Sequence, residues 1–193
     1  MRLFIAIDLS HTLRKHLSEE IEKLTHMLGS DSIRWVKASN IHLTLKFLGE
    51  TPENKLDRIK FTLEDITSQF SSFKMDVGEF GCFPNFRKPR VFWIGVHEHE
   101  GILKQIHHVL EADFEKIGFK KEGRPLTAHL TLGRLRKNIS SSKLQELSTK
   151  LETIHIDHLG IEDVNEICLF SSVLRPSGPE YTRHGEFRLK ETE

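Results

Sequence analysis

Two stretches of the chain repeat one pattern of residues that can carry out acid–base chemistry. The sequence IHLTLKFLG occupies positions 41–49 and AHLTLGRL occupies 128–135, so the tetrapeptide H-L-T-L occurs at 42–45 and again at 129–132. A histidine gives and takes protons near neutral pH, and a threonine hydroxyl donates hydrogen bonds to anionic oxygens. Two histidines and two threonines brought to one place would suit an in-line displacement at phosphorus.

Both copies read as β-strands, which decides where these side chains point. Side chains alternate between the two faces of a strand, so His42 and Thr44 share one face while the motif leucines occupy the other. His129 and Thr131 share a face in the same way. If the two strands lie across a cleft from each other, their polar faces meet and their leucines enter the core.

Two imidazoles beside one phosphorus atom can divide a displacement between them. The neutral ring takes a proton from the attacking water or hydroxyl, and the charged ring gives a proton to the departing oxygen. An unperturbed imidazole has a pKa of about 6.5, so both forms exist near neutrality. Each proton transfer contributes roughly 10²–10⁴-fold in rate. Such a site needs no metal ion, and we expect none.

The positions of apolar residues predict the elements that carry these motifs. Strands are expected at 2–8, 33–36, 41–48, 73–83, 90–96 and 128–135, with further extended segments at 153–158, 163–173 and 181–189. Helices are expected at 10–28, 51–70, 100–117 and 141–152. Both halves of the chain therefore follow the order strand, helix, H-L-T-L strand, helix, strand.

The two halves also agree in spacing. His42 lies 40 positions after Arg2, and His129 lies 39 positions after Arg90, where the corresponding strands begin. Order, spacing and motif position together indicate an internal duplication.

Such a duplication predicts an α+β fold. We expect two pseudo-symmetric lobes, each an antiparallel sheet with outer helices, around a central cleft. Residues 1–193 would form one two-lobed domain with halves at about 1–85 and 90–170, and the C-terminal strands would complete the sheets. No linker-like segment separates the halves, so they should fold as one unit.

The charge balance limits the classes of partner. Lys and Arg number 28, as do Asp and Glu, so the formal net charge is zero. A protein that coats long nucleic acid carries a positive excess, so a nucleic-acid partner would be held locally. The N-terminal apolar run is interrupted by Asp8 and is too short to span a membrane. We therefore expect a cytoplasmic monomer that does not contact membranes.

The cysteines and the other histidines predict no metal or cofactor site. Cys82 and Cys168 lack metal-type spacing and are expected to be buried free thiols. The HEHE run at 97–100 and the histidine pair at 107–108 would not converge as zinc ligands must. The chain has no glycine loop of the kind that cradles phosphates, so we expect no nucleotide cofactor.

Long stretches around the motifs resemble one family. This is the two-histidine (2H) phosphoesterase superfamily, and within it the bacterial and archaeal RNA 2′,3′-cyclic phosphodiesterases, historically named 2′-5′ RNA ligases. The likeness covers nearly the whole chain. It includes RLFIAIDL at 2–9, WVKASNIHLTLKFLGE at 35–50, RVFWIGV at 90–96, LTAHLTLGRL at 126–135 and LFSSVLRPSGPEYTRHGEF at 169–187.

The resemblance implies an enzyme without metal or cofactor that opens an RNA 2′,3′-cyclic phosphate to a 2′-phosphomonoester. It implies that His42 is the proton donor to the departing ribose 3′ oxygen and that His129 is the proton acceptor that activates water. The pseudo-symmetry leaves the reverse order of acid and base open. Thr44 and Thr131 would bind phosphate oxygens, and Arg134, which matches a family arginine, would contact the phosphate.

The residue five positions after each histidine is harder to place. Strict alternation turns Arg134 away from His129, unless Gly133 allows a bulge that brings it back. Phe47 has the same offset from His42. Alternation predicts a core position for Phe47, and the border of the nucleoside pocket is the alternative.

Two loops combine aromatic and basic side chains, which suits a single-stranded RNA end. PNFRKPR at 84–90 offers Phe86 and Arg87, and FKKEGRPLT at 119–127 offers Arg124. A solvated charged loop is the alternative for each of them.

Three functions are compatible with the motifs. The first is hydrolysis of RNA 2′,3′-cyclic phosphate ends. The second is a 2′-5′ RNA ligase or 2′-5′ phosphodiesterase acting on oligonucleotides, since the same imidazoles can run transesterification in either direction. The third is a non-catalytic module that binds RNA ends. The paired histidines argue against this third function, because simple phosphate capture favours arginine or lysine.

Overall fold

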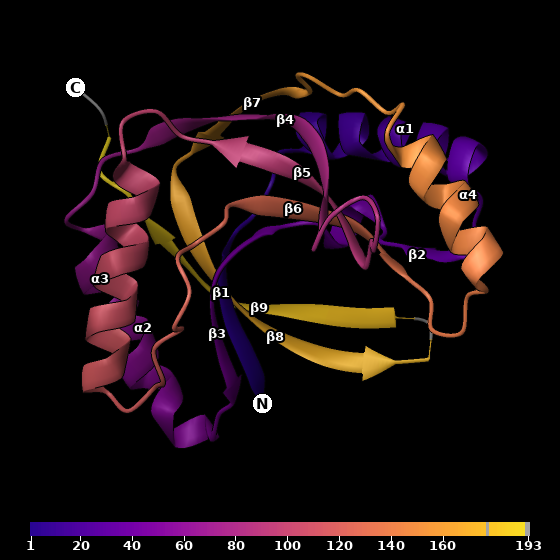
Figure 1. The fold of residues 1–193 in the computed structure, drawn as a ribbon. Coiled ribbons are helices and arrows are strands. Elements are labelled where there is room, and N and C mark those ends of the chain that lie inside the picture. Colours follow the sequence, from indigo (N-terminus) through magenta and orange to yellow (C-terminus); the bar gives the residue numbers. More distant parts are fainter. Residues whose placement is uncertain (177, 192–193) are drawn as a thin grey trace.

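Two antiparallel sheets, with helices packed beside them, make up the computed structural model of the protein (Figure 1). The structure describes residues 1–176 and 178–191; Ser177, in the closing segment of the resemblance, lies outside them. The smaller sheet has the strand order β3-β1-β8-β9, and the larger has the order β2-β6-β5-β4-β7. The predicted α+β fold with two antiparallel sheets is confirmed.

The elements have the following bounds. The strands are β1 (Arg2–Ile7), β2 (Ile33–Trp35), β3 (Leu43–Glu50), β4 (Phe73–Phe83), β5 (Val91–His97), β6 (His129–Leu135), β7 (Gly160–Val164), β8 (Glu166–Arg175) and β9 (Gly178–Arg188). The helices are α1 (His11–Leu28), α2 (Leu56–Thr67), α3 (Ile102–Lys116) and α4 (Ser141–Leu151), with 3₁₀ turns η1 (Ala38–Asn40) and η2 (Glu53–Lys55).

The first helix is fixed at its start by a buried carboxylate of the larger sheet. Ser10 caps α1, because its hydroxyl accepts from the Leu13 N–H at 3.2 Å. The Ser10 N–H and hydroxyl both donate to the carboxylate of Glu162 on β7, each at 2.8 Å. A negative charge at a helix N-terminus is favourable, so this contact both orients α1 and satisfies the buried Glu162.

The sheets do not follow the two halves of the chain. Strands β2 and β4 come from the first half but pair with β6, β5 and β7 of the second half. Strands β8 and β9 then complete the sheet of β1 and β3. The helices are exchanged as well, because α1 packs beside α4, and α2 beside α3 (Figure 1). The order of elements is repeated in the sequence, but their packing interlocks the halves.

A buried ion pair joins β3 to the segment that precedes the second motif. The amino group of Lys46, which is 1% exposed, lies 2.5 Å from a carboxylate oxygen of Glu111 on α3 and donates to the Lys120 carbonyl at 3.1 Å. The other carboxylate oxygen accepts from the Glu122 N–H at 2.7 Å. Both charges are thus paired and hydrogen-bonded inside the protein, and the loop at 119–127 is tied to the first motif strand.

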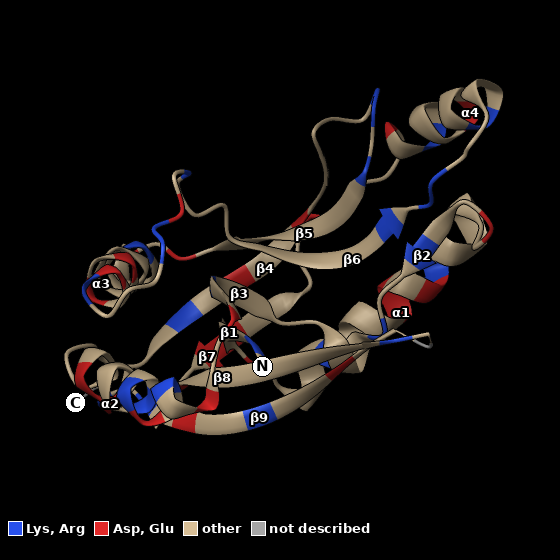
Figure 2. Cartoon of the chain, turned by 90° about the horizontal axis from the view of Figure 1, so that it is seen from below, with Lys and Arg blue, Asp and Glu red and all other residues tan. Residues whose placement is uncertain are grey.

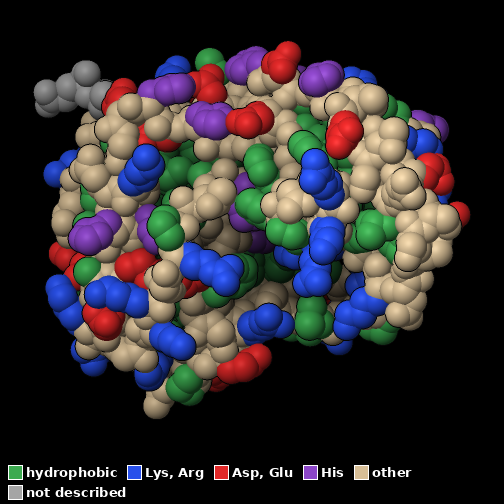
Figure 3. Space-filling view, in the orientation of Figure 1, with side chains coloured by type: hydrophobic (Ala, Val, Ile, Leu, Met, Phe, Trp, Pro, Cys, Tyr) green, Lys and Arg blue, Asp and Glu red, His purple; other side chains and the backbone are tan. Residues whose placement is uncertain are grey.

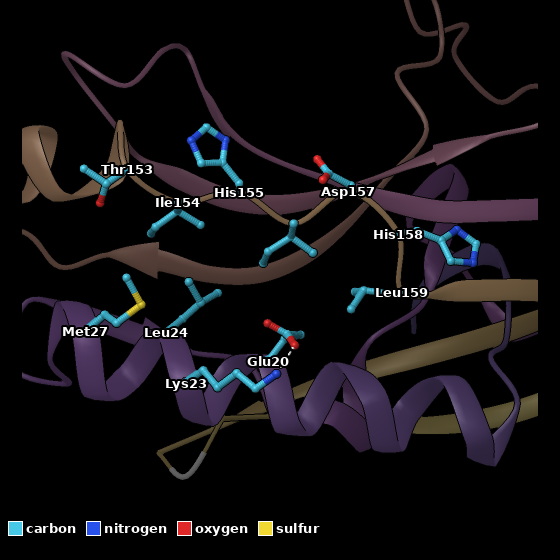
Figure 4. A pocket seen from close by; sticks show the side chains of 11 residues that line it. Glu20, Lys23, Leu24, Met27, Thr153, Ile154, His155, Asp157, His158 and Leu159 are labelled. Atoms are coloured by element: carbon cyan, nitrogen blue, oxygen red, sulfur yellow. Dashed lines mark hydrogen bonds and ion pairs between the residues drawn. The ribbon is translucent and has the colours of Figure 1, made fainter.

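The extended segment expected at 153–158 forms no strand, which corrects that prediction. Ile154 and Ile156 pack inward in turn, as in a strand, but the ladder between β4 and β7 covers only Phe73–Val77 of β4 and ends before the bulge at Gly78–Phe80. The segment therefore lacks a backbone partner. With α1 it forms an open groove of 610 Å³, which contains neither motif (Figure 4).

The apolar residues form two clusters on opposite faces of the smaller sheet. The larger cluster extends through both lobes and includes the motif leucines. The smaller cluster consists of Phe4, Ala6, Cys168 and Phe170, with Tyr181 packed against it. Cys168 and Cys82 are both buried and free, as predicted. The small cluster matters for function because it lies on the face that carries the first histidine.

Candidate active site

The two H-L-T-L copies place their side chains as strand alternation predicts. The four motif leucines are each at most 2% exposed. His42, Thr44, His129 and Thr131 are half-buried on the opposite faces of their strands. The leucines therefore anchor each strand in the core, and the imidazoles and hydroxyls are left facing outward from it.

Both histidines are held by the same local hydrogen bond. His42 Nδ1 lies 3.0 Å from the carbonyl of Asn40, and His129 Nδ1 lies 2.7 Å from the carbonyl of Thr127. A carbonyl can only accept, so Nδ1 carries the proton in each neutral ring and Nε2 keeps its lone pair. Within residues 1–176 and 178–191, neither Nε2 has a hydrogen-bond partner. Each Nε2 is thus available to a substrate.

Aromatic rings surround His42 on the small apolar cluster. Its ring stacks on Phe4 with centroids 4.7 Å apart and meets the edge of Tyr181 at 5.1 Å. Burial lowers the pKa of His42 to about 4, partly opposed by the Asn40 carbonyl and the Asp8 carboxylate. His42 is therefore neutral at pH 7 when no substrate is bound.

His129 has an aromatic setting of its own on the larger sheet. The ring of Phe83 meets His129 edge-on at 5.1 Å, and Trp93 lies 6.4 Å away. Each catalytic candidate thus rests on aromatic side chains from neighbouring strands. Sequence reasoning did not find Phe4 or Phe83 as parts of the site. For Phe4 the signal was present, since strand alternation places it opposite the buried Leu3 and Ile5.

Tyr181 lies beside His42 and is within electrostatic reach of Arg134 on the second motif strand. Its ring contacts His42 from the smaller sheet. Burial raises the pKa of Tyr181, and the nearby charges of Arg134, on the larger sheet, and Arg2 oppose this rise. Strands β3 and β6 also approach each other. Tyr181 therefore marks the region where the face of β3 that carries His42 approaches the end of β6.

A central hollow is visible on the molecular surface. Figure 3 shows it in the middle of the face, with histidine side chains at its floor and Lys and Arg side chains around it. This distribution suits an anionic ligand that reaches the imidazoles from outside.

A bulge turns Arg134 toward this hollow. On β6, Thr131 pairs with Trp93 and Gly133 pairs with Phe92, so the residue between them has no partner on β5. Alternation is therefore interrupted once, and the exposed Arg134 returns to the face of Thr131. The bulge that Gly133 was expected to allow is confirmed.

A matching bulge corrects the core expectation for Phe47. Thr44 pairs with Ala6 and Lys46 pairs with Ile5, so one residue of β3 is again left without a partner. Phe47 then pairs with Phe4, and its ring lies 6.2 Å from that of Phe4. Because Phe47 is 61% exposed, the core prediction is wrong, and its ring lies beside Phe4, on the face of the smaller sheet that carries His42.

An arginine that sequence reasoning missed supports the turn before His42. Arg14 of α1 donates from Nε to the Leu9 carbonyl at 3.0 Å and from Nη1 to the Ser39 carbonyl at 2.8 Å, and it pairs with Asp8. It also donates to the carbonyls of Ala38 and Ile41. Arg14 thus holds η1, the turn whose last carbonyl orients His42. No spacing in the sequence links Arg14 to this turn.

The side chains of the two loops predicted to bind RNA differ in how accessible they are to a ligand. Arg87 and Arg124 are exposed, and neither forms an ion pair with a described residue. Phe86 is half-buried, and its ring stacks on Phe80 at 6.2 Å against the core. The basic side chains are free to meet a ligand, while Phe86 is largely used in packing.

The histidines of the HEHE run each contact a different carboxylate side chain. His97 lies 3.1 Å from Glu79, and His99 lies 2.9 Å from Asp76. Among the described residues, no three His, Cys, Asp or Glu side chains converge as metal ligands. In the same part of the chain, no helix is long and apolar enough to cross a membrane.

Comparison with known proteins gives the family. The family model described as LigT-like phosphoesterase matches residues 7–93 and again residues 94–181, so it covers both halves of the chain. The chain belongs to the LigT-like phosphoesterase family. This confirms the resemblance to the two-histidine superfamily and agrees with the duplicated order of elements.

Named relatives of this family cover almost the whole chain. The RNA 2′,3′-cyclic phosphodiesterase of Methanothermobacter thermautotrophicus is 35% identical over 189 residues, which span 98% of this chain and 99% of the relative. The protein of the same name from Archaeoglobus fulgidus is 35% identical over 181 residues, or 94% of this chain and 96% of the relative.

Solved LigT-like structures share the fold. The protein TT0787 of Thermus thermophilus is 27% identical, with a TM-score of 0.81 and full coverage of both chains. E. coli LigT complexed with 3′-AMP is 26% identical, with a TM-score of 0.76 over 97% of each chain.

Proposed function

We propose that this LigT-like phosphoesterase hydrolyses RNA 2′,3′-cyclic phosphate ends to 2′-phosphomonoesters, with His42 and His129 as general acid and base. The observation that carries this proposal is the matched pair of imidazoles. Each has Nδ1 fixed by a carbonyl two residues earlier and a free Nε2, and the strands that carry them, β3 and β6, contact each other. The relatives named RNA 2′,3′-cyclic phosphodiesterase give the substrate class.

The reaction begins at the water molecule. Neutral His129 takes a proton from water through Nε2, and the water oxygen attacks phosphorus. The bond between phosphorus and the ribose 3′ oxygen breaks, and His42, charged at this stage, gives its Nε2 proton to that oxygen. The product is a 2′-phosphomonoester with a free 3′ hydroxyl. His42 ends neutral and His129 ends charged, and exchange with solvent restores both.

The hydroxyls and Arg134 act on the non-bridging phosphate oxygens. Thr44 and Thr131 lie on the same strand faces as the two histidines, so their hydroxyls can donate to these oxygens as charge develops. Arg134 presents a charged fork from the same face as Thr131. No step in this scheme passes through a metal ion.

Incubation with RNA that ends in a 2′,3′-cyclic phosphate tests the proposal. We expect 2′-phosphorylated product, in the presence of EDTA, as identified by ³¹P NMR and mass spectrometry. His42→Ala and His129→Ala should each lower the rate by at least about 10²-fold, because each removes one proton transfer.

The exposed His108 on α3 provides a matched control, since His108→Ala also removes one imidazole without touching the hollow. Near-full activity in either motif variant, with its fold intact by circular dichroism, would rule out the proposed mechanism. A 2′-5′-linked dinucleotide and a 5′-hydroxyl acceptor, assayed alongside, separate hydrolysis of the cyclic phosphate from 2′-5′ cleavage or ligation. Tight binding of the cyclic-phosphate RNA without turnover would instead indicate a binding module.

A further inference from the structure

A second arginine lies beside Arg134 and has no part in the proposed chemistry. Arg34 of the edge strand β2 is the direct cross-strand partner of Arg134 on β6. Directly paired side chains lie on the same face of a sheet, with Cβ atoms about 4.5–5.5 Å apart. Because the bulge turns Arg134 toward the central hollow, Arg34 faces it too. Figure 2 shows basic segments side by side on β2 and at the end of β6.

In the part of the chain that the structure describes, no carboxylate pairs with either of these two charges. Arg34 and Arg134 are both exposed, and neither forms an ion pair within residues 1–176 and 178–191. Arg14 and Arg183 differ from them, since both pair with Asp8. Like charges in directly opposed positions of a sheet are destabilising. An anion bound between the two guanidinium groups would remove this repulsion.

The smaller sheet adds a third cation, Arg2, in the row of residues that contains Tyr181. On the smaller sheet, Arg2 pairs with Ser172, which pairs with Tyr181, so the three residues form one row across β1, β8 and β9. The charges of Arg2 and Arg134 both act on the Tyr181 hydroxyl. Arg134 thus has Arg34 beside it on its own sheet, and it shares with Arg2 an electrostatic effect on Tyr181, so positive charge gathers around this end of β6.

The chemistry of the substrate indicates which of its groups Arg34 would contact. A cyclic phosphate occupies the 2′ and 3′ oxygens of the last nucleotide, so RNA can continue from the site only in the 5′ direction. Each further nucleotide brings one phosphodiester anion. The planar guanidinium group binds such an anion with two parallel hydrogen bonds.

We propose that Arg34 forms a second phosphate subsite, which binds the phosphodiester joining the terminal nucleotide to the one before it. This inference rests on the proposed function. Arg134 would hold the reacting phosphate and Arg34 the next one, one strand further out on the sheet. The protein would then act faster on oligonucleotide ends than on isolated cyclic mononucleotides, and the substrate class would be RNA of at least two nucleotides.

The test compares a nucleoside 2′,3′-cyclic phosphate with a dinucleotide that ends in the same cyclic nucleotide. Wild-type protein should have the higher kcat/KM on the dinucleotide. Arg34→Gln should lower kcat/KM on the dinucleotide by about 10-fold or more, the loss expected for one charged hydrogen-bonded contact, and leave the mononucleotide almost unchanged. The slope of log kcat/KM against log salt for the dinucleotide should become shallower by about one.

Arg58→Gln on α2 is the matched control, because Arg58 is also exposed and has no ion pair with a described residue. Equal losses on both substrates, no loss on either, or a wild type that does not prefer the dinucleotide would each overturn the subsite. If neither substrate is cleaved, the proposed function fails. Calorimetric binding of the 2′-phosphorylated dinucleotide and mononucleotide then still tests Arg34, which must strengthen the binding of the dinucleotide alone.

Discussion

The charge state of His42 should change when an anionic phosphate binds. In the free protein its pKa lies at about 4 instead of 6.5, mainly because of burial against Phe4 and its neighbours. That difference is worth roughly 3 kcal/mol in favour of the neutral ring. A general acid must be charged before it can give its proton. The proposed role of His42 therefore requires an interaction of at least this size from the substrate.

A phosphate anion supplies an interaction of this size. One unit charge about 4 Å from the ring contributes about 4 kcal/mol at an effective dielectric constant of about 20. A nucleoside 2′-phosphate in the hollow should thus return the pKa of His42 to near its ordinary value. We therefore propose to measure the pKa of His42 with and without this product analogue.

NMR titration of the histidine Cε1 protons can measure both states, with His42→Gln to assign the resonance. We expect His42 to titrate near pH 4 without ligand and above pH 6 with it. A ring that stays neutral down to pH 5 with ligand bound would show that His42 is not the acid, and would favour the reverse order with His129 as donor. A free-protein pKa near 6.5 would refute the argument from burial.

Three further predictions test other parts of the structure. His42 should lower the free energy of unfolding of the ligand-free protein by roughly 3 kcal/mol as the pH decreases from 6.5 to about 4, because the unfolded chain binds a proton on His42 and the folded protein does not. In urea denaturation, the His42→Gln variant should lose this contribution and keep the one of the same sign from His107, whose pKa burial also lowers. Lys46→Met should cost about 3–5 kcal/mol by leaving Glu111 buried without its partner, whereas Lys46→Met with Glu111→Leu should restore most of that stability in the same assay. Arg14→Lys should lower kcat more than about 10-fold with little change in KM, because lysine cannot hold the η1 carbonyls in the geometry that orients His42. A variant with unchanged kcat would exclude this positioning role.

Much of the site could be predicted from the sequence because it depends on strand alternation. The H-L-T-L copies needed only a two-residue period and apolar flanks to assign their faces, and the structure places all four leucines and both histidines accordingly. The element order of both halves followed from apolar spacing in the same way. These are local properties of the chain, and local rules suffice for them.

The errors arise where pairing between distant strands overrides the local period. Phe47 was expected in the core because alternation was extended through a bulge that only the register with β1 reveals. Segment 153–158 alternates like a strand, but the pairing of β4 with β7 ends at Val77, just before a bulge in β4 that only the register with β5 reveals. The role of Arg14 depends on α1 passing behind η1, a contact between elements that no spacing specifies.

The exchange of strands between the two halves has a consequence for how this molecule could have arisen. A chain with only one repeat would expose the strand edges that β2, β4, β8 and β9 now cover, and it would carry one imidazole rather than two. Two such chains could complete each other only by trading strands, as a domain-swapped pair does. A tandem gene fusion would make that trade permanent. It would also allow the two positions that lie five residues after His42 and His129 to change independently. These positions now hold Phe47 and Arg134, respectively.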